Sequence, residues 1–323
     1  MQSIIADSEE TEEAMTKVIF YCDESGAKGY ADQMESEPGE VGVFAGIMVP
    51  DDVLQFAKPA FDAIAVRYAP SSGKLHIADL TAQQQHQLRE ELYAAVRKWN
   101  LPCFWYAVHV AGFNSHHVER EALSKQLREK LAARDNNPPR FKRGSPRSDP
   151  PSLHVTLFEG LYSHLVAFLV ERDRREVTIE VRTDQVDAPI VERFEDVATE
   201  LLNDQPLVDQ TRAFDTVTKQ LVTGALQITV QFPDELKLSP IVNSLSISIA
   251  PDSDGLVLAA DVLANSLYYH FKGRGAEQLY KPLNRPEAVA SHPLASHLDA
   301  FADWGEGDLI GDALYRHPLS EGT

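Results

Sequence analysis

Hydrophobic residues along this chain form short runs that alternate with amphipathic segments, which predicts strands alternating with helices. The runs that predict strands cover residues 17–23, 41–49, 102–110, 177–184, 226–232 and 242–250. The segments with helical spacing cover residues 51–68, 81–99, 115–134, 152–173, 189–204 and 255–271. This order predicts an α/β fold, in which helices flank a mixed sheet.

The first run, KVIFYCD at 17–23, is apolar almost throughout and rich in residues that favour strands. Because it lacks polar alternation, we expect a strand that is covered on both faces and lies at the centre of the sheet. It ends abruptly in Asp23 and Glu24, and a Ser-Gly turn follows. Either the strand simply meets solvent there, or its tip holds carboxylates that bind a metal ion.

Local signals place several boundaries. Thr81 and Ser152 are expected N-caps, and Pro189 is expected in the first turn of its helix. We expect a disordered acidic tail at 1–16 and one domain at 17–272, with helical insertions at 51–100 and 115–151. A C-terminal extension follows at 273–323.

The stretch RDNNPPRFKRGSPRSDPP at 134–151 has no apolar period and predicts a flexible loop. Five basic residues against two acidic ones give it a local charge of +3. It is either a solvated loop or a mobile arm that contacts phosphates.

Composition narrows the classes of protein. The apolar fraction is 43%, as in globular proteins, and we expect no membrane helix and no signal peptide. Cys22 and Cys103 are isolated, which favours buried free thiols in a reducing cytoplasm. The net charge of −19 repels phosphate, so any contact with nucleic acid needs a local basic patch or metal ions.

Carboxylates at four positions are candidates for a functional site. Asp23 and Asp184 each end a predicted strand, where the sites of open α/β sheets gather. Glu159 lies at the edge of an apolar helical stripe, where it either takes part in a site or reaches out to solvent or an arginine.

Asp261 has mostly apolar neighbours at helical spacing and is therefore expected on or beside a buried face. Aspartate is rarely buried without a partner, so it either belongs to a site or bonds a backbone amide. Four clustered carboxylates would repel one another, and divalent cations would relieve that repulsion. Two such cations can also activate water for attack on a phosphodiester.

The motifs YCDESG at 21–26 and DSDGLVLAADVLANSLYYHF at 252–271 resemble the domain-of-unknown-function family 3800. Members of that family typically begin with a strand ending in Asp-Glu-Ser-Gly and end with a helix carrying Ala-Asp. The resemblance spans roughly residues 17–272 and implies a ribonuclease-H-like fold. Carried over position by position, it implies site acids at Asp23, Glu159, Asp184 and Asp261.

Two points of this resemblance stay open. Asp187 competes with Asp184 for the place at the strand end. The segment KLHIADL at 74–80 has Lys74 where the family often has an acidic or polar residue, so the roles of His76 and Asp79 are undefined.

The leading hypothesis is a metal-dependent nuclease or related phosphodiester hydrolase that uses Mg²⁺ or Mn²⁺. Asp23, Asp184 and Asp261 would bind the ions, and Glu24 or Glu159 would be a further ligand or orienting group. RNA or DNA would be the substrate, and a membrane is not an expected partner. The alternatives are a binding module for nucleic acid or protein, and a nuclease effector in bacterial defence that a partner protein holds.

Overall fold

The computed structural model describes residues 17–70, 75–134, 141–143, 150–172, 174–184, 186–202, 207–228, 241–251, 253–299 and 315–319. The helices are α1 (Asp51–Tyr68), α2 (Ala82–Trp99), α3 (Val110–Arg134), α4 (Leu153–Glu171), α5 (Ala188–Leu202) and α6 (Gly255–Lys272). The strands are β1 (Lys17–Gly26), β2 (Val41–Pro50), β3 (Cys103–His109), β4 (Phe141–Arg143), β5 (Val177–Thr183), β6 (Leu207–Asp215), β7 (Leu221–Ile228), β8 (Val242–Ile249) and β9 (Leu298–Asp299).

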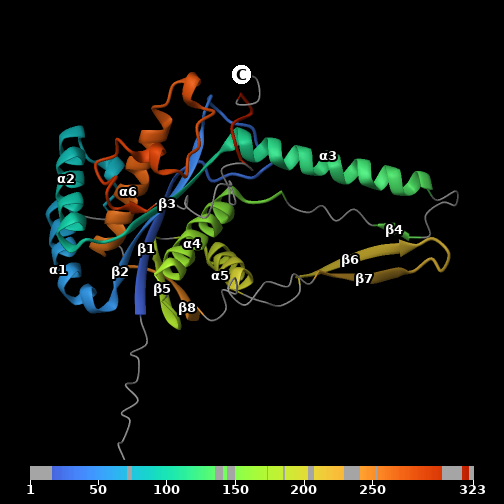
Figure 1. Cartoon of the computed structure of the whole chain (residues 1–323), viewed down its shortest axis with the longest axis horizontal. Coiled ribbons are helices and arrows are strands. Elements are labelled where there is room, and N and C mark those ends of the chain that lie inside the picture. The colour runs from blue at the N-terminus through green and yellow to red at the C-terminus, as the bar shows by residue number, and fades with distance from the viewer. Residues whose placement is uncertain are drawn as a thin grey trace, which may run out of the picture.

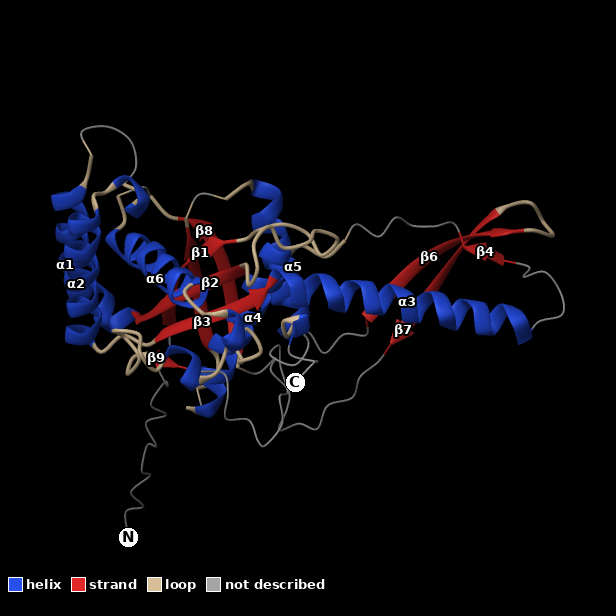
Figure 2. Ribbon diagram, turned by 90° about the horizontal axis from the view of Figure 1, so that it is seen from above, coloured by secondary structure: helices blue, strands red, loops and turns tan. Residues whose placement is uncertain are grey.

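The central sheet has the strand order β8-β5-β1-β2-β3-β9 (Figure 2). Strand β1 runs antiparallel to β2 and parallel to β5, and β5 runs parallel to β8. The sheet is therefore mixed, with β1 at its centre, as the continuous apolar run predicted. This arrangement confirms the α/β class.

Helices cover both faces of this sheet, and two separate cores result (Figure 1). Tyr21 packs in the core formed with α1, α2 and α6, whereas Phe20 and Cys22 pack in the core formed with α4 and α5. Successive side chains of a strand point to opposite faces. Asp23 and Glu24 therefore leave the tip of β1 on opposite sides of the sheet.

The predicted N-caps are confirmed. The Thr81 hydroxyl accepts a hydrogen bond from Gln84 N, whose side chain bonds the Thr81 backbone in return, so the two form a capping box. The Ser152 hydroxyl accepts from Val155 N at the start of α4. Both cysteines are buried and free, as expected.

Helix α4 is long and apolar enough to cross a membrane by length and composition, and it is the one such helix in the part of the chain that the structure describes. Its apolar surface packs against β2, β3 and α5, and 67% of its most apolar 18-residue stretch is buried inside the protein. The apolar character of α4 thus reflects a core position between a sheet and a helix.

A second, three-stranded sheet has the order β4-β6-β7 and extends with α3 to one side of the central sheet (Figure 1). Strand β4 lies inside the segment predicted as a loop, so that prediction is wrong for residues 141–143. Strand β6 was not predicted, and β7 begins earlier than expected. The rest of the predicted basic loop and the acidic tail at 1–16 lie outside the described residues.

Residues after α6 contribute to the core on the α1–α6 side. Trp105 Nε1 donates to Leu283 O at 2.9 Å, and the Asn284 amide bonds both backbone groups of Ala107. Strand β9 adds to the sheet beside β3. The described part of the predicted C-terminal extension therefore packs directly on the central sheet.

Candidate active site

Asp23 and Asp184 lie side by side at the tips of two neighbouring parallel strands. The last registered pair between β1 and β5 is Cys22 with Thr183, and each aspartate is the next residue along its strand. Neighbouring strands are about 4.8 Å apart. Because paired residues share a face, both aspartates face the α6 side of the sheet.

Helix α6 runs alongside β1 and brings a third carboxylate to this tip. Three observations define its course: the charge of Asp254 raises the pKa of Tyr21, the charge of Asp261 raises the pKa of Asp23, and Tyr268 packs against Gly26. A Cβ at Gly26 would lie 2.4 Å from Val41 O and 2.6 Å from Tyr268 Cδ2, and Gly26 has a φ of 86°. Only glycine suits this position, which lets the helix lie close to the strand.

Asp23 is a buried carboxylate with other carboxylates around it. Its side chain accepts a hydrogen bond from Glu24 N at 2.8 Å, yet the residue is only 6% exposed. Burial raises the pKa of Asp23 well above its usual range, and the charges of Glu24 and Asp261 raise it further. Holding this group ionised without a cation nearby therefore costs free energy.

A cavity of about 140 Å³ opens beside these acids. Asp184, Ser253, Asp254 and Asp261 line it together with apolar residues of α1 and α6, whereas Asp23 does not line it. Asp187, the competing strand-end acid, is exposed at the start of α5 and does not line the cavity. The structure therefore brings Asp184 to the site and leaves Asp187 outside it.

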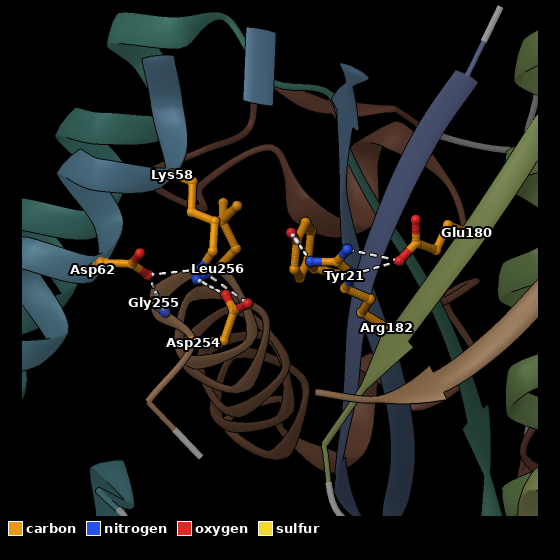
Figure 3. A network of polar contacts seen from close by, with 8 residues as sticks. All are labelled: Tyr21, Lys58, Asp62, Glu180, Arg182, Asp254, Gly255 and Leu256. Carbon is orange, nitrogen blue, oxygen red and sulfur yellow. Dashed lines mark hydrogen bonds and ion pairs between the residues drawn. The ribbon is translucent and has the colours of Figure 1, made fainter. Parts of the chain in front are cut away.

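The beginning of α6 is held by a charged network that the sequence did not predict (Figure 3). Asp254 caps the helix by accepting from Leu256 N at 3.0 Å, and Asp62 of α1 accepts from Gly255 N at 2.9 Å. Lys58 reaches both carboxylates, at 3.0 Å from Asp254 Oδ2 and 2.9 Å from Asp62 Oδ1. Burial works against the Lys58 charge, but these two partners outweigh it and raise its pKa.

A second cationic side chain, that of Arg182, lies on β5 two residues before Asp184. Arg182 donates to Glu180 Oε1 at 2.7 Å and to the Tyr21 hydroxyl at 3.1 Å (Figure 3). Its charge also interacts with Asp254. Lys58 and Arg182 thus flank Asp254 and compensate its charge, which gives Asp254 a structural explanation that does not need a metal ion.

Glu24 lies on the opposite face of the sheet from Asp23. It pairs with Lys28, and its Oε2 atom is 3.5 Å from His154 Nε2 at the start of α4. Burial alone would raise its pKa, but His154 and Lys28 outweigh this effect and lower the pKa to about 2. These contacts make Glu24 an anchor between the tip of β1 and α4.

Glu159 is not brought to the strand tips. It lies on the exposed side of α4, on the face of the sheet opposite α6. Partial burial and the nearby Glu200 of α5 raise its pKa. A residue of α4 that does contact the tip of β1 is His154, through Glu24, and sequence analysis missed it.

The segment at 74–80 contributes to the cavity through Leu75, whereas Lys74 lies outside the described residues. His76 is exposed and precedes the short helix Ile77–Asp79. Neither His76 nor Asp79 lines the cavity.

A serine–histidine pair elsewhere does not form a nucleophile. Ser266 Oγ lies 2.6 Å from His292 Nε2, but His292 Nδ1 accepts from Leu294 N at 3.2 Å. An imidazole that accepts at Nδ1 carries its proton on Nε2, so His292 donates to Ser266 and cannot take its proton. Burial lowers the pKa of His292 to about 4, and the charges of His270 and Arg89 contribute.

The acids at the strand tips fit a hard divalent cation by their chemistry, because Mg²⁺ and Mn²⁺ prefer carboxylate oxygens. Within the part of the chain that the structure describes, no three His, Cys, Asp or Glu side chains are already arranged as a metal site. Cation binding would therefore require the side chains of Asp23, Asp184 and Asp261 to turn toward one point. Their positions on two adjacent strands and a packed helix keep that adjustment local.

In comparisons with protein-family models and with curated proteins, no family and no relative matches this chain. The positions of the side chains therefore provide the basis for a functional assignment.

Proposed function

We propose that this protein is a divalent-metal-dependent nuclease or a related phosphodiester hydrolase, in which Asp23, Asp184 and Asp261 hold Mg²⁺ or Mn²⁺. One observation carries the proposal: Asp184 and Asp261 line a single cavity, and Asp23 follows the neighbouring strand beside Asp184 and interacts electrostatically with Asp261. The burial of Asp23 among other acids supports it, because a cation would relieve the repulsion that raises its pKa.

The arrangement of elements supports a ribonuclease-H-like version of the fold. When the second sheet and helices α1, α2 and α3 are set aside, the order is β1, β2, β3, α4, β5, α5, β8 and α6. Site acids on β1, at the end of β5 and on α6 follow the pattern of that fold. The two end motifs, at 21–26 and 252–271, support a relationship to the domain-of-unknown-function family 3800. The buried free thiols favour a reducing cytoplasm as the location.

Each residue has a defined task in this proposal. Asp23 presents a carboxylate from a central strand that is largely buried, and Asp184 and Asp261 supply oxygens from neighbouring elements. Lys58 and Asp62 hold the start of α6, which positions Asp261 two turns later. When bound, divalent cations supply an activated water and neutralise the phosphodiester, which also offsets the chain's net charge of −19.

The test is cleavage of RNA, DNA and RNA–DNA hybrids with Mg²⁺, with Mn²⁺ and with EDTA. We expect cleavage only with a divalent cation. Asp23→Asn and Asp261→Asn should each lose ~100-fold or more, because even the partners of metal ligands are worth 10–100-fold. Asp187→Asn and Glu159→Gln are matched controls that should cleave like the unaltered protein.

The same variants provide a test of metal binding that does not depend on finding the right substrate. Mn²⁺ should raise the melting temperature of the unaltered protein, since a ligand that binds only the folded state stabilises it. Asp23→Asn and Asp261→Asn should lose this rise. Unchanged cleavage and unchanged stabilisation in both variants would remove the proposed mechanism.

A binding module on the same fold is the second candidate. It is favoured by the observation that the described residues contain no ready-made metal group and by the net charge of −19, which suits a protein partner. A third candidate is a nuclease effector in bacterial defence that a partner protein holds. It would combine the cleavage of the first candidate with the protein partner of the second. Metal-independent binding without turnover on any of the three nucleic acids would favour the module.

A further inference from the structure

Helix α3 and strands β4, β6 and β7 form a lateral arm that extends away from the central sheet (Figure 2). In the part of the chain that the structure describes, neither buried core includes a residue of β4, β6 or β7, or a residue of α3 after Phe113. From Val118 onward, every α3 side chain whose burial the structure describes is exposed. Small sheets become stable when an apolar face packs against other structure. The lateral arm therefore needs a surface that covers it.

The far end of the lateral arm presents apolar side chains on a fixed turn, which joins β6 to β7 (Figure 1). Val217 is 70% and Leu221 is 74% exposed there, and Phe214, which pairs with Leu221, is 37% exposed. The buried Asp215 accepts hydrogen bonds from Val217 N at 2.8 Å and Thr218 N at 3.3 Å, which holds the turn. A contact through a turn that is already ordered loses little conformational entropy. We call Phe214, Val217 and Leu221 the tip.

The near end of the lateral arm presents a second group of exposed apolar side chains. One backbone and one side-chain hydrogen bond join the segment 30–40 to the first turns of α3. On this segment Met34 is 79% and Tyr30 is 50% exposed. Leu319, in the segment 315–319 that also packs on the start of α3, is 62% exposed. We call Tyr30, Met34 and Leu319 the base.

The two ends of the lateral arm carry charges of opposite sign. The segment 30–40 contains four acidic residues and no basic one, and Lys272 offsets one of these charges through an ion pair at 2.6 Å. At the far end Lys219 is exposed in the turn, and the register of β4 with β6 brings Lys142 and Arg143 to the end of β6. The tip is therefore apolar with basic surroundings, and the base is apolar with acidic surroundings. Such surfaces attract each other and fit in one orientation.

A single chain cannot bring these two surfaces together, because they lie at opposite ends of a long element. The 25 residues of α3 span about 37 Å. When two lateral arms lie antiparallel about a two-fold axis, the tip of each reaches the base of the other. A two-fold axis makes the two contacts identical and closes the assembly at two copies. The exposed Val118 and Leu123 of α3 then lie between these contacts.

We propose that two copies of this chain form a dimer through antiparallel lateral arms, in which the tip of each copy packs on the base of the other. The inference does not depend on the proposed function, because neither the metal ligands nor cleavage enters the argument. Helix α1, which lines the cavity, lies on the side of the central sheet away from the lateral arm (Figure 1). Dimer formation therefore leaves the candidate active site open.

The first experiment measures the mass of the full chain by light scattering and sedimentation at roughly 1–100 μM, the range in which a micromolar dimer dissociates. We expect twice the mass of one chain at the higher concentrations. The double variant Val217→Asp, Leu221→Asp should dissociate ~100-fold more readily, since both residues occur in both contacts and central apolar contacts dominate interfaces. Both side chains are exposed, so circular dichroism should show an unchanged fold.

Phe56→Asp is the matched control, because Phe56 is an apolar residue that is 60% exposed on α1 and far from the lateral arm (Figure 1). It should form dimers like the unaltered chain. The mass of a single chain at every concentration would overturn the dimer, whether or not the lateral arm then binds a nucleic acid. Equal dissociation of the control and the tip variant would overturn the role of the tip.

A second experiment tests the orientation of the two copies. Chains with Met34→Cys and chains with Val217→Cys are mixed at low concentration, concentrated and treated with a short bismaleimide; Cys22 and Cys103 are buried and should not react. We expect a cross-linked dimer that contains one chain of each kind. Phe56→Cys mixed with Val217→Cys should give none. Cross-links formed mainly between two Val217→Cys chains would overturn the contact between tip and base.

Discussion

At the scale of single residues, Asp23 has the most unusual environment of the candidate site. It is 6% exposed, follows an apolar strand, and has Glu24 as its neighbour in sequence and Asp261 as its neighbour in space. A carboxylate in this position reduces the stability of the folded protein when it is ionised, because both burial and repulsion favour the protonated form. Residues that reduce stability in this way commonly serve a function.

Replacing Asp23 with asparagine should therefore stabilise the protein in EDTA. Its folded pKa is raised, so the destabilisation is present above the raised pKa and absent below the ordinary value of 3.8. The amide oxygen keeps the acceptor for Glu24 N while removing the charge. At pH 7 we therefore expect the midpoint of urea unfolding to rise, with its slope unchanged.

Asp187→Asn is the control for this measurement, because its exposed carboxylate should change stability little. A loss of stability in Asp23→Asn would mean that the ionised carboxylate stabilises the fold. In that case the structural interpretation of Asp23 would replace the metal-binding one.

At the scale of elements, the orientation of α6 depends on α1. The two helices are nearly 200 residues apart in sequence, yet Lys58 and Asp62 of α1 bind Asp254 and Gly255 at the first turn of α6 (Figure 3). A Cβ at Gly255 would lie 2.2 Å from the backbone of Phe61, so the helices approach closely there. The placement of Asp261 follows from this junction.

Removing the Lys58 charge should loosen that junction. We expect Lys58→Met to cost about 2 kcal/mol, because it removes the cation that pairs directly with the buried Asp254 carboxylate and leaves only the charge of Arg182 to compensate it. In the Asp254→Asn background the same substitution should cost much less, and the double-mutant cycle measures the difference by urea unfolding.

Lys17→Met provides the comparison for this cycle. Lys17 pairs with Glu180 at 3.1 Å, but its side chain is 41% exposed, and exposed pairs contribute at most about 1 kcal/mol. Equal costs for Lys17→Met and Lys58→Met, or a cycle without coupling, would show that the junction does not depend on the ion pair.

At the scale of the whole molecule, residues 315–319 pack against the start of α3. A Cβ at Gly112 would lie 2.1 Å from Tyr315 O, so only a glycine there admits that backbone. His317 packs its ring against His109 of β3 with centroids 5.3 Å apart, and its Nε2 lies 3.4 Å from Glu35 Oε2. Burial lowers the pKa of His109 to about 3, and the charges of His317 and Arg274 contribute.

This buried imidazole makes the fold sensitive to acid. Below its ordinary pKa of 6.5 the unfolded chain takes up a proton at His109 that the folded protein does not, so stability falls from pH 6.5 toward pH 3. The loss attributable to this group reaches up to about 3 kcal/mol at pH 4, at about 1.4 kcal/mol per pH unit. His109→Phe should remove most of this dependence in unfolding measured between pH 7 and pH 4.

His86→Phe is the matched control, since His86 is exposed on α2 and its replacement should leave the pH dependence unchanged. An unaltered pH profile in His109→Phe would mean that His109 takes up its proton in the folded state as well.

The sequence by itself determined strands β1, β2, β3, β5 and β8 and the helices around them, because hydrophobic periodicity and caps are local properties of the chain. The boundaries of α1 and the caps at Thr81 and Ser152 show this. The two-residue strand β9 of the same sheet was not predicted. Strand β6 was not predicted, because its sequence has neither a continuous apolar run nor a regular alternation of apolar and polar residues. The position of Asp254 directly before a predicted helix could have identified it as an N-cap. No pattern in the sequence around Lys58 indicated that it pairs with Asp254.

Only the tertiary structure decided which carboxylates meet. Sequence analysis assigned Asp23, Glu24, Glu159, Asp184 and Asp261 to one site. The alternation of side chains along β1 and the two faces of the sheet separate Glu24 and Glu159 from the other acids. The register of β1 with β5 selected Asp184 over Asp187, and the close approach of α6 to β1 added Asp261. These choices depend on contacts between residues more than 150 positions apart, which no local pattern encodes.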